Sequence, residues 1–479
     1  MAQQRQPADR PETTRLPLIG AYTNRGYSPT KDQRFVNVFP ETRKVEQLEN
    51  TKIFLNKRPG LTLYRDYGTG EGRGVIYFNN KFYVAVGNTV YEDAVSPVAK
   101  ITLTTSTGPL GMIIGNSAST GDYLFICDGT SGWVINSAGT ATQIVDADFP
   151  TPHIPSPTFL DGYIILAKGS DVYNCDLDVP TSWTASNFLS AEMFPDSVRA
   201  LARQNNQVVV MGGNSIEFFY DAANASGSPL SRNDSTTIQM GVAAPYCIYQ
   251  NEKFCAYISQ SDSGGRAVWL VEGFQPKKVS DEYIERILDA ETDMSDCRGY
   301  GLRTKGHMFY VINLKTLGRT LVYDTDEKLW HEWSSNTAGS HGVFACDYMA
   351  DNATGVAYLL HNSNGSLYKL DVDNSQDDGT GILVEIVTNK YDMDTYVRKF
   401  MSNIKVVGDS YETGNAVVVS FSDDDYKSWS NPKTIGLTDS FPAFHRMGAF
   451  RRRAFRITHS LNYPLRLESL ECTYTKGIS

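Results

Sequence analysis

The chain has 479 residues, with 44 Lys and Arg against 54 Asp and Glu, so its formal net charge at pH 7 is −10. Proteins that wrap nucleic acid by neutralising its phosphates are basic, so this balance disfavours such a function, although DNA could slide past an acidic surface. The 39 glycines, 27 tyrosines and 22 phenylalanines favour strands and turns over helices.

The cysteines and the N-terminus indicate a reducing compartment. The seven cysteines are an odd number without a CxxC pair, which favours free thiols buried as small apolar residues. Residues 1–12 lack the apolar region of a signal peptide, and no apolar run reaches the ~18 residues that span a bilayer. We therefore expect a soluble protein, made in the cytoplasm, without a membrane-spanning segment.

The N-terminal part divides into two segments. Residues 1–14 are polar and are predicted to form a flexible arm. Residues 15–70 read as an N-terminal β segment, punctuated by Pro40 and by the Pro59-Gly60 pair. We expect this segment either to pack on the C-terminal domain or to close the domain that follows it.

A hairpin pattern recurs along the middle of the chain. Its clearest copy is Tyr163–Asp176, where an apolar run leads through Gly169 to a short strand carrying Tyr173 and ending in Asp176. Such a pattern is typical of a β-hairpin whose glycine supplies the positive φ of the turn. Further copies begin at Phe82, Tyr123, Val208, Phe254, Met308 and Val356.

The spacing of these copies, roughly 40–50 residues, is typical of propeller blades, which bury their apolar faces by stacking around a ring. The predicted fold class is therefore all-β, with a β-propeller of six or seven blades over residues 71–373. We expect the recurring aromatic to pack between blades, and the following acid or Asn to cap the next turn. The expected aromatics are Tyr91, Trp133, Tyr173, Phe218, Trp269 and Tyr368.

Three segments interrupt the repeat. Residues 281–290 are predicted to form a short helix. Residues 187–199 and 224–237 read as insertions, and the small polar residues of the second indicate a long exposed loop. After a polar linker at 373–380 the period changes, and residues 381–479 read as a C-terminal β-sandwich, completed in one interpretation by N-terminal strands.

No catalytic, cofactor-binding or metal-binding motif stands out, and the seven histidines are scattered. His331-Glu332-Trp333 is interpreted as a packed strand, because a lone His–Glu pair has no third partner. Residues 422–429 (SDDDYKSW) resemble the Asp-box turn of sialidases, with Tyr426 where glycine is usual. We interpret it as a structural turn, with a cation site at its three acids as the alternative.

One dense basic cluster lies near the C-terminus: Arg446, Arg451, Arg452, Arg453 and Arg456. On a strand, Arg451 and Arg453 would point to one side and Arg452 to the other. Arginines among phenylalanines are typical of protein–protein interfaces, so a candidate assembly interface ranks first. A solvated face ranks second and a DNA phosphate site third.

Four passages together resemble the tail hub, or nozzle, proteins of short-tailed phages, also called packaged-DNA stabilisation proteins. The passages are VNVFPE (36–41) with KRPGL (57–61), GNSIEFFY (213–220) with QMGVA (239–243), HRMG (445–448), and YPLRL (463–467) continuing to Glu471. None of them is a catalytic motif, and the resemblance lies in their joint occurrence along nearly the whole chain.

The resemblance implies a structural, non-enzymatic virion tail protein without a cofactor. It implies a homohexamer below the portal–adaptor (head–tail connector) ring, carrying tail needle, spike or fibre proteins. Genomic DNA would pass through its lumen without sequence-specific binding. The alternatives are a propeller-type glycan-degrading enzyme, which needs converging carboxylates, and a receptor-binding tail protein.

Overall fold

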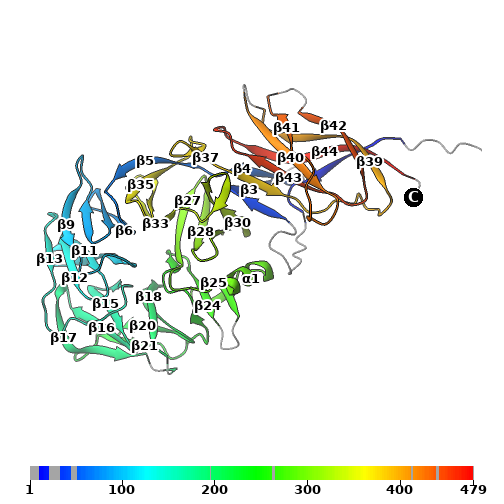
Figure 1. Ribbon diagram of the computed structural model, residues 1–479. Helices are drawn as coiled ribbons and strands as arrows, with labels where there is room; N and C mark the ends of the chain where they lie inside the picture. Colours follow the sequence, from blue (N-terminus) through cyan, green and yellow to red (C-terminus); the bar gives the residue numbers. More distant parts are fainter. Residues whose placement is uncertain are drawn as a thin grey trace, which may run out of the picture. The chain divides into compact units, whose positions relative to one another are not determined.

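The computed structural model describes residues 10–20, 33–44, 51–191, 193–194, 196–260, 265–410, 414–438 and 442–477. In these ranges the regular structure is β except for a single α-helix, so the all-β prediction is confirmed (Figure 1). Backbone contacts divide the chain into two compact units. Unit 1 comprises residues 1–61, 321–342 and 371–479, and unit 2 comprises residues 62–320 and 343–370.

Unit 2 is built from antiparallel sheets that follow one another along the chain. The first is β6 (Gly72–Phe78), β7 (Lys81–Val86), β8 (Thr89–Glu92) and β9 (Val98–Thr102), and the second is β10 (Gly111–Ser117), β11 (Gly121–Cys127), β12 (Gly132–Asn136) and β13 (Ala141–Gln143). The third is β14 (Thr158–Leu160), β15 (Tyr163–Lys168), β16 (Asp171–Asp176) and β17 (Val179–Ser190), and the fourth is β18 (Val198–Gln204), β19 (Gln207–Gly212), β20 (Ile216–Asp221) and β21 (Leu230–Arg232).

Three more sheets complete the series. The fifth holds β22 (Gly241–Val242), β23 (Tyr249–Gln250), β24 (Cys255–Gln260), β25 (Arg266–Glu272) and β26 (Gln275–Lys278). The sixth begins with β27 (Arg298–Thr304) and β28 (His307–Leu314). The seventh is β33 (Cys346–Asp351), β34 (Ala357–His361) and β35 (Ser366–Asp371), with β5 (Gly60–Asp66) beside β35.

These sheets close into a ring. The inner strands contact in the order β6, β10, β14, β18, β23, β27 and β33, and β33 contacts β6 again. A closed ring of seven sheets is a seven-bladed propeller, so the predicted fold is confirmed and the blade number is the larger of the two expected. Because β5 is the outer strand of the last blade, an early segment of the chain joins the two ends of the ring.

The expected roles of the repeat are confirmed at several of its positions. Trp133 packs in one buried cluster with side chains of the first blade such as Tyr83, and Phe218 shares a cluster with Trp269 of the next blade. Asn136 Oδ1 accepts hydrogen bonds from the backbone N–H groups that follow it in the turn, and Asp221 Oδ1 does the same. All seven cysteines are free and buried.

One of the three interruptions, 187–199, differs from its predicted form, and a second, 224–237, differs in part. The helix α1 (Glu282–Ala290) matches the prediction, and Asp281 caps its N-terminus by accepting from Ile284 N at 2.9 Å. The supposed loop at 224–237 contains β21, whose Leu230 is buried in the core between blades. Most described residues of 187–199 extend β17 or begin β18, while residues 192 and 195 lie outside the described ranges. Residues 187–199 therefore belong largely to blades, whereas 224–237 is mostly loop, as predicted, apart from β21.

Unit 1 contains two sheets. One comprises β3 (Val38–Lys44), β4 (Thr51–Lys57), β44 (Arg466–Lys476), β39 (Lys399–Gly408) and β42 (Ala443–Phe450), with β1 (Glu12–Pro17) also pairing to β44. The other contains β30 (Leu329–Trp333), β2 (Arg34–Val36), β38 (Val384–Val387), β43 (Ala454–His459), β40 (Ala416–Ser422) and β41 (Lys433–Gly436). β29 (Arg319–Asp324) leads into this unit. Short hairpins are formed by β31 (Ser335–Thr337) with β32 (Ser340–Gly342) and by β36 (Gln376–Asp377) with β37 (Thr380–Gly381).

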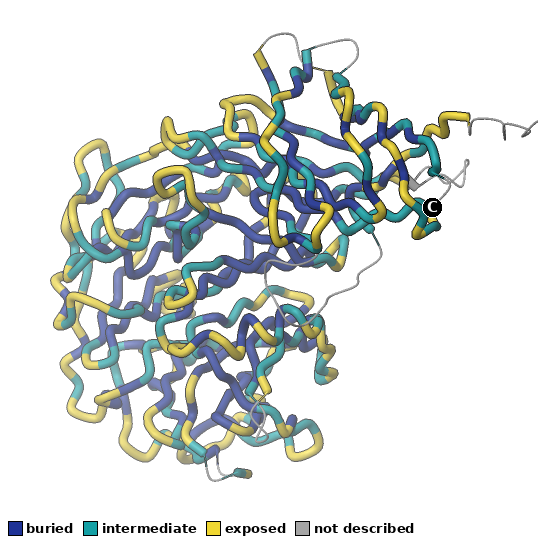
Figure 2. The backbone as a smooth tube through the Cα atoms, turned by 45° about the vertical axis from the view of Figure 1, so that its right-hand side comes forward, coloured by how far each residue is buried: buried dark blue, intermediate teal, exposed yellow. Residues whose placement is uncertain are grey.

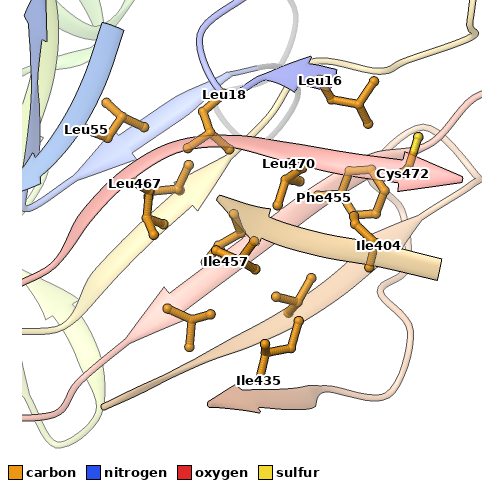
Figure 3. Close-up of a cluster of buried hydrophobic side chains, with 14 of the residues drawn as sticks. Leu16, Leu18, Leu55, Ile404, Ile435, Phe455, Ile457, Leu467, Leu470 and Cys472 are labelled. Carbon is orange, nitrogen blue, oxygen red and sulfur yellow. The ribbon is translucent and has the colours of Figure 1, made fainter. Parts of the chain in front are cut away.

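Both sheets of unit 1 contribute to one apolar core, which includes Leu16, Leu55, Ile404, Ile457 and Leu467 (Figure 3). Buried positions recur along the strands, while the connecting turns are mostly exposed (Figure 2). The C-terminal part is therefore sandwich-like and includes N-terminal strands. Residues 12–14 of the expected arm lie in β1, and residues 1–9 fall outside the described ranges.

Candidate assembly interface

The five arginines of the predicted interface do not form one patch. Arg446 is exposed on a bulge of β42, where Asn403 pairs with His445 and Met401 with Gly448. Two residues of β42, Arg446 and Met447, therefore lie opposite the single Ser402 of β39, and Arg446 adopts a φ of 60°. The neighbouring Met447 is buried in the core of unit 1, which leaves the Arg446 side chain on the surface.

Arg453 serves the interior of the chain. Its guanidinium donates from Nε and Nη2 to the Asp423 carboxylate at 2.7 Å each, and from Nη1 to Met447 O at 2.8 Å. It lies 3.9 Å from the Phe421 ring centre and 4.6 Å from that of Phe450. Only 1% of Arg453 is exposed, so this side chain offers no surface to a partner. The candidate interface therefore reduces to the other four arginines.

The remaining arginines differ in their surroundings. Arg451 is exposed and donates from Nη1 to Tyr396 O at 2.8 Å. Arg456 is half-buried, with its guanidinium 4.7 Å from the Trp429 ring centre. Arg451 and Arg452 lie in a bend before β43, so the strand alternation expected for them is wrong.

Arg451 and Arg452 border an open groove of about 800 Å³ in unit 1. Its lining is strongly charged and carries both signs. The lining residues are Lys390, Tyr396, Arg398, Asp423, Asp424, Asp425, Ala449, Phe450, Arg451 and Arg452. Seven of these ten lining residues are charged.

The acidic side of the groove is the Asp-box-like turn, and the hydrogen bonds confirm that it is structural. Asp424 accepts from Ser422 Oγ at 2.9 Å and from Ser428 N at 3.0 Å, and hydrogen bonds from Ser428 lower the pKa of Asp424 to about 2. Tyr426 adopts the left-handed φ of 63° that glycine would supply, and its hydroxyl donates to Thr388 O at 3.0 Å. Burying the ring and bonding its hydroxyl offsets the backbone strain of that conformation.

The three carboxylates that would form the alternative cation site at this turn each have a partner already. Asp423 is bound by Arg453, Asp425 is paired with Lys390, and Asp424 is held by the two serines. Within the described ranges, no group of His, Cys, Asp and Glu side chains has the arrangement of a metal site.

The VNVFPE and KRPGL passages meet in a buried polar network that sequence reasoning did not identify. Asn37 Oδ1 accepts from Arg58 Nε and Ser334 N, each at 2.8 Å, and Asn37 Nδ2 donates to Leu383 O. Arg58 also donates to both Asp377 oxygens, at 2.9 and 2.5 Å. The available signal was Asn37 between the two valines of VNVFPE, because a polar residue within an apolar run marks a buried group that needs partners; KRPGL carries no such local signal for Arg58.

The other passages are also structural. Gly241 of QMGVA lies so close to Gly213 of GNSIEFFY that a Cβ at Gly241 would be 1.7 Å from Gly213 O. Leu465 and Leu467 of YPLRL fill the core of unit 1, and Arg466 stacks 3.7 Å from the Phe54 ring centre. Likewise Glu332 of the His331-Glu332-Trp333 run binds Arg34 at 2.9 Å, as expected of a packed strand. Each passage joins distant segments of one unit.

Among the described residues, no helix has the length and apolarity needed to cross a membrane.

Comparison with solved structures returns propeller proteins of low similarity. A streptogramin B lyase structure has a TM-score of 0.38 at 10% identity, covering 66% of this chain and 97% of that one. The RRP9 WD40 repeats have a TM-score of 0.41 at 10% identity, covering 66% and 99%. Scores below 0.5 support no conclusion about this chain.

Comparison of sequences is more informative. Residues 14–374 match the family described as bacteriophage P22 Gp10, beta-propeller. The tail hub protein gp10 of Salmonella phage P22 is 26% identical over 297 residues, which is 58% of this chain and 60% of that protein. The match thus spans less than two thirds of the relative's length. Because the family match covers most of the chain and agrees with its propeller, the chain belongs to the bacteriophage P22 Gp10 β-propeller family and is a protein of the phage virion tail.

Proposed function

We propose that the chain is a structural hub subunit of a phage tail. In this proposal it forms a homohexameric ring below the portal and adaptor ring, continues the DNA channel, helps to retain the packaged genome, and carries needle, spike or fibre proteins. The observation that carries the proposal is the family match over residues 14–374, which includes the P22 tail hub protein.

The ring contacts are assigned to the surface arginines of unit 1. A closed ring needs heterologous contacts, in which one patch of a subunit meets a different patch of the next. Arg446 and Arg451 are exposed on one unit that also carries exposed aromatic side chains, including Tyr396 at 66% and Phe400 at 49%. Arginine and aromatic residues are enriched in protein interfaces, which supports this assignment.

The net charge of −10 supports a DNA channel without sequence-specific binding. An acidic wall repels phosphates, so DNA that passes it is not retained by ion pairs with the wall. The same charge argues against tight binding of free duplex. The proposed hub needs no catalytic residue and no cofactor.

The test is to locate a tagged copy in purified tails by electron microscopy, and to measure the native mass of the assembled protein. The proposal expects a sixfold ring between the adaptor and the distal tail parts. A trimer, or a label confined to the tail tip, would contradict it and favour a receptor-binding protein. Release of reducing ends from host polysaccharide by purified protein would contradict the non-enzymatic role.

A matched pair of variants tests the assigned contacts. Arg446→Glu with Arg451→Glu should leave a folded subunit that fails to enter the ring, because two interface cations become anions. Arg286→Glu, on the exposed face of α1 in unit 2, is the control and should assemble normally. Normal tails from the double variant would exclude these two residues from the contact.

A further inference from the structure

The charged groove of unit 1, defined by its ten lining residues from Lys390 to Arg452, carries unbalanced positive charge. Of its four cations, only Lys390 has a carboxylate within ion-pair distance among the described residues. Arg398 is exposed, and Arg452 is half-buried with its Nε shielded from solvent and without a hydrogen-bond partner there. Among the described residues, Arg451 contacts the carbonyl oxygen and the ring of Tyr396 and has no carboxylate partner.

The carboxylates across the groove do not neutralise these arginines. Asp423 is bound by the internal Arg453, Asp425 by Lys390, and Asp424 by Ser422 and Ser428. Each acid therefore already has a partner other than Arg398, Arg451 and Arg452. The three arginine charges that remain are available to an anionic group entering the groove.

The surroundings add to this positive field. The buried Lys399 follows Arg398 directly and donates from Nζ to Thr395 O at 2.6 Å and Val397 O at 2.9 Å. Burial is the main cause that lowers the pKa of Lys399; the nearby Asp392 carboxylate opposes this, while the charges of Arg451 and Lys476 lower the pKa further. A carboxylate placed in the groove would relieve the repulsion among these cations.

An aromatic side chain stands beside the cations. The Tyr396 ring is 66% exposed, and the Arg451 guanidinium lies 5.8 Å from its centre. An exposed ring of this kind offers an apolar face to an incoming side chain. The groove therefore presents cations and an aromatic platform together.

The lining favours a peptide over DNA. A duplex carries one charge per about 1.7 Å of its axis and requires an extended row of cations. Here the lining carries three aspartates as well as three arginines, so the phosphates of a duplex would also meet carboxylates. A peptide can place one or two carboxylates at the arginines and keep its other residues neutral.

We propose that this groove binds an acidic segment of a partner protein, with carboxylates at Arg398 and Arg452 and an apolar side chain on Tyr396. The inference rests on the proposed hub function, because it assigns the groove to a different tail protein from the neighbouring copy in the ring. The docking site adjoins the proposed ring contact, because Arg451 and Tyr396 belong to both, and Arg398 and Arg452 distinguish it from that contact.

The experiment uses the full chain and a fluorescein-labelled peptide with a central phenylalanine flanked by glutamates and serines. Fluorescence anisotropy should show salt-sensitive binding. The variant Arg398→Gln with Arg452→Gln should weaken binding about tenfold, and Tyr396→Ala should weaken it as well. Arg286→Gln is the control, and a peptide with glutamine in place of glutamate should bind no better to wild type than to the double variant.

Unchanged affinity in the double variant, or equal affinity for the glutamine peptide, overturns the proposal. Labelled duplex DNA that binds more tightly than the peptide and loses affinity in the same variant also overturns it. Thermal unfolding at the wild-type temperature excludes misfolding as the cause of lost binding. Native mass distinguishes the failure of the docking site from the failure of the proposed hub function. A normal ring that does not bind the peptide rejects the docking site alone. Peptide binding by a chain that never forms a ring rejects the hub function.

Discussion

The buried network around Arg58 makes a strong prediction about stability. The Arg58 side chain is fully buried, and its guanidinium binds Asp377, Asn37 Oδ1 and the carbonyl oxygens of Pro59 and Ser334. Arg58→Met keeps much of the buried side-chain volume but removes the charge and every donor. We expect it to destabilise unit 1 strongly.

The magnitude follows from what is left behind. Removing one partner of a buried ion pair costs about 3–5 kcal/mol, because the other charge remains uncompensated. The Asp377 side chain is 16% exposed, so water recovers part of that cost and places the effect near the lower limit. A loss of about 3 kcal/mol lowers the melting temperature of a unit of this size by about 6–12 °C.

Differential scanning calorimetry at neutral pH measures this effect. Arg43→Met is the matched control: its ion pair with Glu41 is 62% exposed on the arginine side, so the expected loss is under about 1 kcal/mol. The double variant Arg58→Met with Asp377→Leu should be more stable than Arg58→Met alone, since it removes the orphaned charge. A single variant that loses less than about 1 kcal/mol, or a double variant that gains nothing, would refute the reasoning.

Three further predictions concern single sites. Burial and the nearby Arg58 lower the pKa of Lys57 from 10.5 to about 7. Above pH 7 the unfolded chain therefore binds more protons than the folded one, so the free energy of unfolding of wild type should rise by about 2 kcal/mol relative to Lys57→Met between pH 7 and 9. Parallel curves of stability against pH for the two proteins would contradict this. Gly241→Ala places a Cβ 1.7 Å from Gly213 O. The backbone must shift to relieve this clash, which should lower the free energy of unfolding by about 1–3 kcal/mol. An unchanged melting temperature would exclude the contact. In an NMR titration Asp424 should show a pKa of about 2, moving toward 3.8 in Ser428→Ala, and an unmoved value would deny the role of that serine.

The propeller could be predicted because its signal is local and repeated. A hairpin such as Tyr163–Asp176 is specified by neighbouring residues: an apolar run, a glycine at the turn and an aromatic strand. Even the cap at Asn136 uses backbone groups two and four residues further on. Because the pattern occurs seven times, misinterpreting one copy has little effect on the prediction of the fold. The fold class and the approximate propeller region could therefore be predicted from the sequence.

The candidate interface was less predictable, because burial depends on partners distant in sequence. Arg452 and Arg453 are adjacent and chemically identical, yet one lines the groove and the other is buried. The difference is Asp423, 30 residues earlier, which is brought to Arg453 when β40 pairs with β43. No local pattern distinguishes the two arginines, so the interface as first predicted included a residue that holds the interior together.

By itself, the sequence determined the recurring hairpins, the helix and the family, because these depend on short-range spacing and on passages that can be compared directly. The tertiary structure alone decided that β5 completes the seventh blade, that β1 to β4 enter unit 1, and that Asn37 and Arg58 share a buried network with Asp377. It also decided which arginine charges remain free at the groove. The physical reason is that burial and charge pairing are set by which distant segments meet.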